Sequence, residues 1–268
     1  GIIGNIHVIW AILKFPDLRT KNGVLLCFLA CHHTVCLCFE TLSGIRMRIG
    51  PSMTRRQCYS SIFVYTYTIN HQCGLVLVLV CDIAFCMIRP LKYSQTRVYP
   101  YVHLMQIPCY VFGITFLIWG FLTINDEVIM ACNPPLSYAF NVLNIWNICY
   151  LTANAATVII YSSAIIYTMC CGGPLRQTGG KMSAASLAAQ QRIVKSLSSL
   201  LIIFCFSWFL GAVAVRGPMV FKMDAEFVAF VQTYAVVPAV ITYAQTYYVY
   251  YFSSRDYQEA FKKIGIFG

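Results

Sequence analysis

The chain has 268 residues, of which 59% are hydrophobic and only 10% carry a charge. Its length would suit one or two soluble domains, but this composition is typical of a membrane protein and argues against a soluble one. The net charge of +10 indicates attraction to anionic lipid surfaces rather than binding to nucleic acid. We therefore expect membrane lipid as a partner and no nucleic acid.

The apolar residues gather in stretches long enough to cross a bilayer, which takes about 20 helical residues each. We predict an all-α membrane protein, a seven-transmembrane helix bundle that forms a single domain over residues 1–268. The predicted spans are residues 1–13, 23–42, 59–88, 102–122, 140–170, 193–215 and 227–252. The first span is short and begins inside its apolar run without an initiator Met, so we expect the sequence to be truncated at its start.

Lysine and arginine are spread unevenly over the joints between these spans. Thirteen of the 19 lie in or beside the joints after the first, third and fifth spans and in the C-terminal tail. Because cytoplasmic loops carry an excess of positive charge, we expect this side to face the cytoplasm. The protein would then lie in the plasma membrane with its N-terminus extracellular and its C-terminus cytoplasmic.

The tail after the last span has an amphipathic pattern. Ser253 or Ser254 could cap a helix in which Tyr257, Phe261 and Ile264 share one face. We expect this short helix to lie along the cytoplasmic membrane surface. A frayed polar tail is the alternative.

Cys58 and Asp82 lie near opposite ends of the third span. They are 24 positions apart, about 36 Å along a helix, which nearly matches the membrane with its interfaces. We expect Asp82 at the cytoplasmic edge, hydrated or close to the basic loops, and Pro90 at the end of the helix. Cys58 then lies at the outer mouth, where Cys132 is the one other cysteine expected outside the bilayer on the oxidising side. A Cys58–Cys132 disulfide follows; two free thiols are the alternative.

The residues Cys58, Asp82, Pro90 and Leu91 resemble the third helix of rhodopsin-like G-protein-coupled receptors. Within that superfamily the whole chain most resembles the nematode serpentine chemoreceptor class Srsx, through GN in the first span, LRTKNGVLLCFLACHH, TRRQCY, DIAF with IRPLKY, and CNPP. The resemblance implies a chemoreceptor that binds an extracellular small molecule or peptide and signals through a heterotrimeric G protein. The Asp-Arg-Tyr triplet of the superfamily reads Asp-Ile-Ala here, with Ile83 in place of the arginine.

Further positions of the resemblance lie along the interior of the bundle. Asn5 and His33 should lie at similar depth, and we expect a structural contact between them; sodium binding near His33, where the superfamily has an aspartate, is the alternative. Phe204 and Trp208 match an aromatic pair that lines the floor of the ligand pocket in the family, and ordinary core or lipid-facing aromatics are the alternative. Tyr251 matches the tyrosine that ends the seventh helix.

The ligand class is suggested by a position in the third span. Seventeen positions before Asp82, amine receptors carry an aspartate, and this chain has Tyr65. A charged amine would lose its expected anchor, so we predict an aromatic, neutral pocket for a small odorant or a peptide side chain. The predicted lining is Tyr65, Asn144, Trp146, Asn147, Trp208, Gln232 and Tyr234. Ordinary helix packing is the alternative for each of them.

On the cytoplasmic side, the resemblance implies that the inner ends of the third, fifth and sixth helices shift to engage the G protein. The residues predicted for the switch and for coupling are Asn5, His33, Asp82, Arg89, Pro90, Phe204, Trp208 and Tyr251. The basic rim predicted around the cleft consists of Arg89, Lys92, Arg97, Arg192 and Lys195.

Other classes of function have weaker support. An opsin needs a lysine in its seventh helix, and residues 227–252 contain none. A secondary transporter or channel, which we keep as the alternative, would need ionisable residues along a path; the spans hold little besides His33, Glu40 and Asp82. No span offers two acids, or a serine with a placed histidine, for catalysis. We expect no enzyme activity, no catalytic or metal-binding residues and no cofactor.

Overall fold

A computed structural model gives the fold of the chain. It describes residues 1–49, 52–129, 131–170, 198–199, 201–203, 206–207, 209–211, 213–214, 216–218, 220–234 and 236–265. The elements with assigned bounds are α1 (Ile2–Lys14), η1 (Pro16–Leu18), α2 (Lys21–Ile49), β1 (Met53–Thr54), α3 (Arg55–Ile88), α4 (Pro90–Gln95), α5 (Val98–Thr123), β2 (Val128–Ile129), α6 (Pro134–Ser137), α7 (Phe140–Cys170), α10 (Ala225–Tyr234), α11 (Val236–Ser253) and α12 (Arg255–Ile264).

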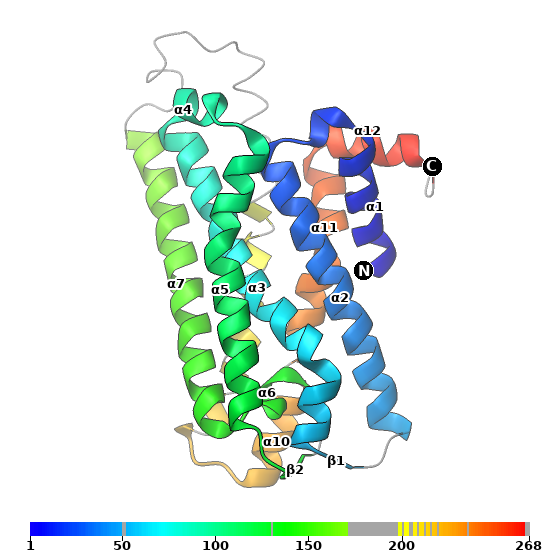
Figure 1. Ribbon diagram of the computed structural model, residues 1–268. Coiled ribbons are helices and arrows are strands. Elements are labelled where there is room, and N and C mark those ends of the chain that lie inside the picture. Colours follow the sequence, from blue (N-terminus) through cyan, green and yellow to red (C-terminus); the bar gives the residue numbers. More distant parts are fainter. Residues whose placement is uncertain are drawn as a thin grey trace.

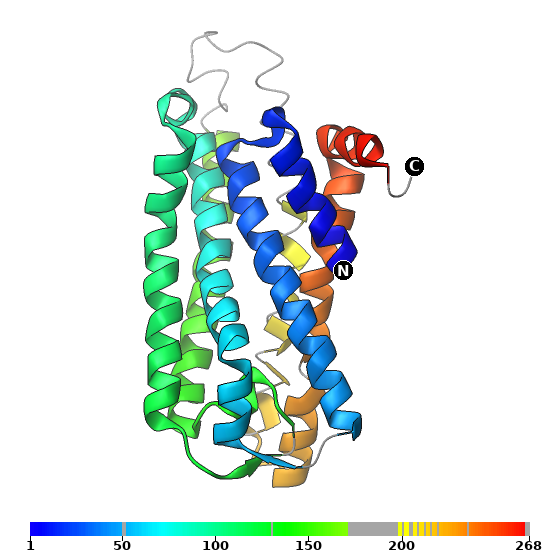
Figure 2. The same ribbon diagram turned by 45° about the vertical axis from the view of Figure 1, so that its right-hand side comes forward.

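The long helices lie side by side in an elongated bundle (Figure 1). η1, α4 and α12 lie at one end, which we call the Asp82 end because Asp82 lies in the last turns of α3 there (Figures 1 and 2). β1, β2, α6 and α10 lie at the opposite end. We call this the disulfide end because Cys58, in the first turn of α3, forms a disulfide there.

Four of the described helices, α2, α3, α5 and α7, are long and apolar enough to cross a membrane, and α1 is a shorter apolar helix. The prediction of a helical, multi-pass membrane protein is therefore confirmed. These four helices contain the predicted spans 23–42, 59–88, 102–122 and 140–170. The predicted span 193–215 is described only in part, in short pieces, and span 227–252 falls on α10 and α11.

α3 is the central helix and packs against α2, α5 and α7. A capping box begins it: the Thr54 hydroxyl accepts a hydrogen bond from the Gln57 backbone, and the Gln57 side chain accepts one from the Thr54 backbone at 3.0 Å. The helix then runs for 34 residues, which is about 50 Å. Arg89 leaves helical geometry, and Pro90 begins α4, because a proline cannot donate the backbone bond that would continue α3.

α3 and α5 approach each other closely at Gly120. The Tyr59 side chain of α3 lies against this glycine, and its hydroxyl donates a hydrogen bond of 3.0 Å to the Leu117 carbonyl. A Cβ atom at position 120 would lie 2.0 Å from the Tyr59 hydroxyl oxygen. A glycine is needed here because small residues let membrane helices approach closely.

Two apolar clusters form the core. One, at the Asp82 end, includes Leu79 and Tyr250, and the other, at the disulfide end, includes Tyr65. The outward side of α5 carries large exposed apolar residues such as Leu104 and Ile118. Such a continuous apolar face is what contact with lipid requires.

α12 follows α11 at the Asp82 end, where it turns away from the direction of the long helices and points outward from the bundle (Figure 2). Its Tyr257 and Phe261 are buried, and Tyr257 packs against Tyr250 with ring centroids 4.8 Å apart. Lys262 and Lys263 are exposed. The helix thus has a buried aromatic face and an exposed basic face.

Candidate functional site

At the disulfide end, Cys58 and Cys132 form a disulfide with Cα atoms 5.4 Å apart, so the predicted pairing is confirmed. The bond spans 74 positions and joins the first turn of α3 to the segment between α5 and α7. The Ser43 hydroxyl of α2 donates a hydrogen bond of 3.0 Å to the Cys132 carbonyl. Two helices therefore hold this segment over the end of the bundle.

The same segment is fixed by two ion pairs and a short strand pair. Arg55 lies 2.7 Å from Glu127, and Arg56 lies 2.8 Å from Asp126. The hydrogen bond from Arg56 holds the pKa of the Asp126 carboxyl below its ordinary value. β1 pairs antiparallel with β2 beside these contacts. The disulfide end is thus closed by covalent, backbone and ionic contacts together.

Beneath this cover, Asn70 of α3 organises the interior. Its amide nitrogen donates a hydrogen bond of 2.9 Å to the Tyr138 hydroxyl, and its amide oxygen accepts one of 2.8 Å from the Trp146 indole. Tyr150 donates a hydrogen bond of 2.6 Å to the Ile69 carbonyl. Trp146, a predicted pocket residue, therefore has its N–H already bonded. Asn70 was missed in the sequence, although a polar residue in an apolar span is itself a signal of an interhelical bond.

Tyr65 occupies the position from which the ligand class was predicted, and it is 2% exposed. Its hydroxyl donates a hydrogen bond to the Glu40 carboxylate of α2. The Phe39 ring stacks on the Tyr65 ring, with centroids 5.7 Å apart and planes 10° apart. Tyr65 therefore has an ionisable side chain as its partner, and the neutral pocket stays a prediction. An acid within a membrane span signals function by itself, but sequence spacing does not show that Glu40 meets Tyr65.

The other predicted pocket residues are more dispersed. Asn147 is 3% exposed, and the Asn144 side chain accepts a hydrogen bond of 3.5 Å from Arg216. Tyr234 is 58% exposed, and its ring packs against Phe230 at 4.8 Å. The predictions for Phe204, Trp208 and the side chain of Gln232 lie outside the described residues. A shared cavity for these residues stays a prediction.

Midway along the bundle, Asn5 and His33 are fully buried, but the structure corrects their predicted contact. The Asn5 amide donates a hydrogen bond of 2.9 Å to the Tyr243 carbonyl, and His33 Nδ1 lies 2.9 Å from the Thr246 hydroxyl. Asn5 Oδ1 and His33 Nε2 have no hydrogen-bond partner among the described residues. Both side chains bind α11, because equal depth in two helices does not fix the direction in which their side chains point.

At the Asp82 end, Asp82 is 1% exposed, so it is buried rather than hydrated. Its Oδ2 atom accepts a hydrogen bond of 3.1 Å from the Tyr93 hydroxyl. Lys21 of α2 places its ammonium group 4.1 Å from the centroid of the Tyr93 ring and donates to the Tyr93 carbonyl. Tyr93 therefore connects the acid of α3 to a base of α2.

Two further polar groups border the Asp82 carboxylate. The Asn22 amide and the Tyr101 hydroxyl lie close to it without a hydrogen-bond partner among the described residues. Burial and the nearby acid raise the pKa of Tyr93 above its ordinary value, which keeps its hydroxyl protonated as a donor. Ile83, in the place of the superfamily's arginine, is 2% exposed and packs in the core.

The remaining predicted coupling residues lie around this network. Pro90 is buried, whereas Arg89, Lys92 and Arg97 are exposed. Arg192 and Lys195, the other members of the predicted rim, lie outside the described residues.

Tyr251 is half-buried and stacks on Tyr247, with ring centroids 5.8 Å apart. Its neighbour Tyr250 is the fully buried tyrosine at this end of α11 and was not predicted. The packing of Tyr250 on Tyr257 of α12 gives α11 and α12 a shared aromatic contact.

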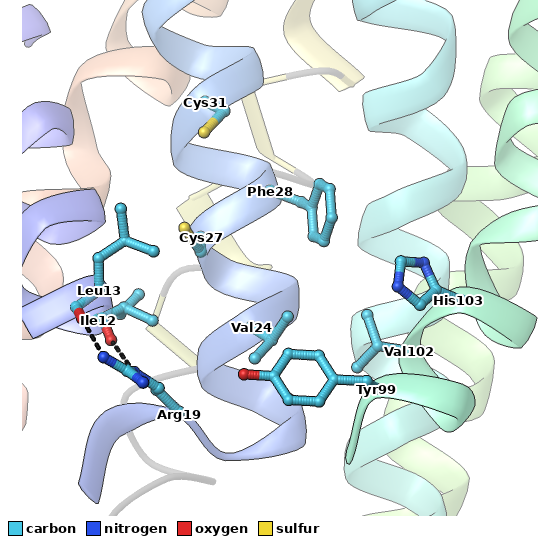
Figure 3. A pocket seen from close by; sticks show the side chains of 10 residues that line it. All are labelled: Ile12, Leu13, Arg19, Val24, Cys27, Phe28, Cys31, Tyr99, Val102 and His103. Atoms are coloured by element: carbon cyan, nitrogen blue, oxygen red, sulfur yellow. Dashed lines mark hydrogen bonds between the residues drawn. The ribbon is translucent and has the colours of Figure 1, made fainter. Parts of the chain in front are cut away.

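A groove of about 430 Å³ lies between α1, α2 and α5 near the Asp82 end (Figure 3). Its walls are mostly apolar, with Arg19, Tyr99 and His103 as the longer polar side chains. Arg19 donates a hydrogen bond of 3.3 Å to the Ile12 carbonyl and a second to the Leu13 carbonyl, so it caps the C-terminal end of α1. The groove contains none of the residues predicted for the ligand pocket.

Apolar helices long enough to cross a bilayer, a disulfide at one end and a buried acid network at the other define a multi-pass helical membrane protein. The family model described as "Serpentine type 7TM GPCR chemoreceptor Srsx" matches residues 1–264. The chain therefore belongs to this family of chemoreceptors, as the sequence motifs indicated. No curated protein matches the chain.

Proposed function

We propose that the chain is a seven-helix chemoreceptor of the plasma membrane that binds an extracellular small molecule or peptide and signals through a heterotrimeric G protein. Family membership over residues 1–264 carries this proposal. The excess of lysine and arginine in the joints at the Asp82 end supports a cytoplasmic position for that end. The N-terminus would then be extracellular and the C-terminus cytoplasmic.

The ligand site belongs at the disulfide end. The Cys58–Cys132 bond and the Arg55–Glu127 pair, with the strand ladder, hold the covering segment in one place, which supports a pre-formed entrance. Asn70 of α3 fixes the positions of two aromatic rings, Tyr138 just before α7 and Trp146 within it. The proposed lining is Tyr65, Asn144, Trp146, Asn147, Trp208, Gln232 and Tyr234. Rigid surroundings lower the ordering cost of binding.

The switch belongs at the Asp82 end, where ligand binding shifts the population of two arrangements of the helices. In the resting arrangement, Tyr93 joins Asp82 to Lys21 and so ties α3 to α2 and α4. Because Ile83 stands in place of the arginine that rearranges elsewhere in the superfamily, we assign the restraint to this tyrosine-centred network. Activation releases Tyr93 from Asp82.

Signals pass between the two ends through the middle of the bundle and reach the G protein at the basic rim. The proposed switch and coupling residues are Asn5, His33, Asp82, Arg89, Pro90, Phe204, Trp208 and Tyr251. The exposed side chains of Arg89, Lys92 and Arg97 suit both an acidic protein surface and anionic lipid.

A reporter assay tests this function. Cells that express the chain are exposed to a panel of small metabolites and peptides, and G-protein activation is recorded with and without a G-protein inhibitor. We expect a compound-dependent response that the inhibitor abolishes and that a chain with Cys58→Ala and Cys132→Ala fails to give. Absence of any such response, together with compound flux into vesicles that contain the chain, would favour a transporter instead.

A further inference from the structure

Glu40 places a carboxylate inside the disulfide end of the bundle. The residue lies on α2 and is half-buried, and its partner Tyr65 lies seven positions along α3 from Cys58, or about 10 Å below the disulfide. Tyr65 belongs to the buried cluster that also includes Cys36 and Tyr243. The acid therefore faces the interior of the bundle and not the lipid.

The Glu40 carboxyl group forms no ion pair with a basic residue in the described part of the chain. The ion pairs found there are Arg55–Glu127 and Arg56–Asp126, both in the cover of the disulfide end. The hydrogen bond that Glu40 receives comes from the uncharged Tyr65 hydroxyl. A carboxylate removed from water without a cation is costly, and ionisable residues within membrane spans mark ligand or ion sites by default.

The partner of the acid, Tyr65, belongs to a group of aromatic rings. Phe39 stacks on Tyr65 with centroids 5.7 Å apart, and Tyr243 of α11 packs in the same cluster as Tyr65. Faces of aromatic rings attract ammonium and guanidinium groups. A carboxylate beside such rings is the arrangement that recognises an organic cation, since charge and ring faces act on the same group.

We propose that Glu40, held by Tyr65, binds the cationic group of the receptor's ligand, which is an ammonium or guanidinium carried on an apolar body. This inference rests on the proposed function, because it names the ligand class of the proposed pocket. Amine receptors carry an acid on the third helix at the position that Tyr65 occupies here. Glu40 of α2, which is hydrogen-bonded to Tyr65, supplies the charge instead. Glu40 thus adds a charged group to the predicted lining of the pocket, whose other residues are all uncharged.

The test measures thermal unfolding of the purified chain in lipid nanodiscs with three matched sets of probes. The first set is benzylamine and 2-phenylethylamine, the second is the corresponding alcohols, and the third is the corresponding carboxylates. A compound that binds the folded state raises its unfolding temperature. We expect the amines to stabilise the chain at concentrations at least about tenfold below those at which the alcohols or carboxylates do so, because a charge-assisted bond contributes at least that factor.

Three variants link the selectivity to Glu40. Glu40→Gln keeps an acceptor for the Tyr65 hydroxyl but removes the charge, and we expect it to weaken amine binding by about 10- to 100-fold. Glu40→Asp keeps the charge and should keep the preference for amines, which distinguishes lost recognition from lost folding. Glu226→Gln makes the same change at an exposed position and should match the unaltered chain.

Equal stabilisation by amines and alcohols, preference for carboxylates, no stabilisation by either amine, or an unchanged amine response in Glu40→Gln would each overturn the inference. None of these results depends on a G protein, so the receptor function could still stand. Conversely, amine binding without G-protein activation would leave the cation site in place and count against the proposed function.

Discussion

The Tyr93 hydroxyl donates a hydrogen bond of 3.1 Å to Oδ2 of Asp82, and the two residues lie on either side of the break between α3 and α4. The Tyr93 ring also carries the Lys21 ammonium 4.1 Å from its centroid. The Tyr93 side chain, on α4, thus contacts both α3, through Asp82, and α2, through Lys21. Removing its hydroxyl leaves a buried acceptor without its donor.

Tyr93→Phe should therefore lower the stability of the chain by about 1–3 kcal/mol, the cost of a broken hydrogen bond to a buried acid. It should also raise G-protein activation in the absence of ligand, because the resting arrangement is weakened. Thermal unfolding and the basal reporter signal measure the two effects. Tyr99→Phe is the control, since Tyr99 is 57% exposed. Equal behaviour of the two variants would remove Tyr93 from the proposed switch.

The disulfide should dominate the stability of its end of the bundle. The bond closes a loop of 74 positions, for which the chain-entropy relation gives about 4 kcal/mol. Cys58→Ala with Cys132→Ala should lower the unfolding temperature and reduce the amount of chain at the cell surface. Cys38→Ala, which changes an exposed free cysteine, should have no such effect. A double variant as stable as the single control would contradict the importance given to this bond.

Gly120 should tolerate no side chain. In Gly120→Ala the new methyl group would lie 2.0 Å from the buried Tyr59 hydroxyl oxygen, so α3 and α5 must separate or the ring must leave its site. Overpacking of this kind costs about 1–3 kcal/mol. Gly44→Ala meets nothing within 4 Å and should be neutral or slightly stabilising. The ratio of folded to unfolded chain in a thermal scan distinguishes the two variants.

The Arg56–Asp126 pair should make a contribution that depends on pH and on salt. Because the pKa of Asp126 is lowered in the folded chain, the unfolded chain binds more protons, and stability from this pair rises with pH. The contribution is complete above about pH 4, the ordinary value for an aspartate, and is lost as the pH falls through the lower folded value. Asp126→Asn should therefore differ from the unaltered chain at pH 7 and low salt, and less at pH 3 or at high salt. Asp17→Asn, a change at another exposed acid, is the control variant.

The sequence predicts those parts of the fold that depend on one coordinate, the position along the membrane normal. The Cys58–Cys132 bond follows because few cysteines lie outside the spans, and the break at Pro90 follows from proline chemistry. α2 extends beyond the predicted span 23–42 and ends at Ile49. In this last stretch Arg46 donates a hydrogen bond of 2.9 Å to the Ser61 hydroxyl of α3, a tertiary contact that hydropathy does not contain.

Contacts that depend on the direction of a side chain around its helix were not predictable in the same way. Asn5 and His33 lie at matching depth, but both bind α11 rather than each other. Likewise, Glu40 of α2 accepts a hydrogen bond from Tyr65 of α3. The role of Tyr93 was also missed, because the loop after α3 has no periodicity that points its hydroxyl toward Asp82. Each of these partners is set by the packing of the bundle.

The orientation of the chain in the plasma membrane is tested most directly by one epitope tag at Gly1 and a different one at Gly268. Seven crossings place the two ends on opposite faces. Antibodies to the first tag should stain intact cells, and antibodies to the second should stain only after permeabilisation. Both tags reacting on the same side of intact cells would contradict the seven-helix receptor.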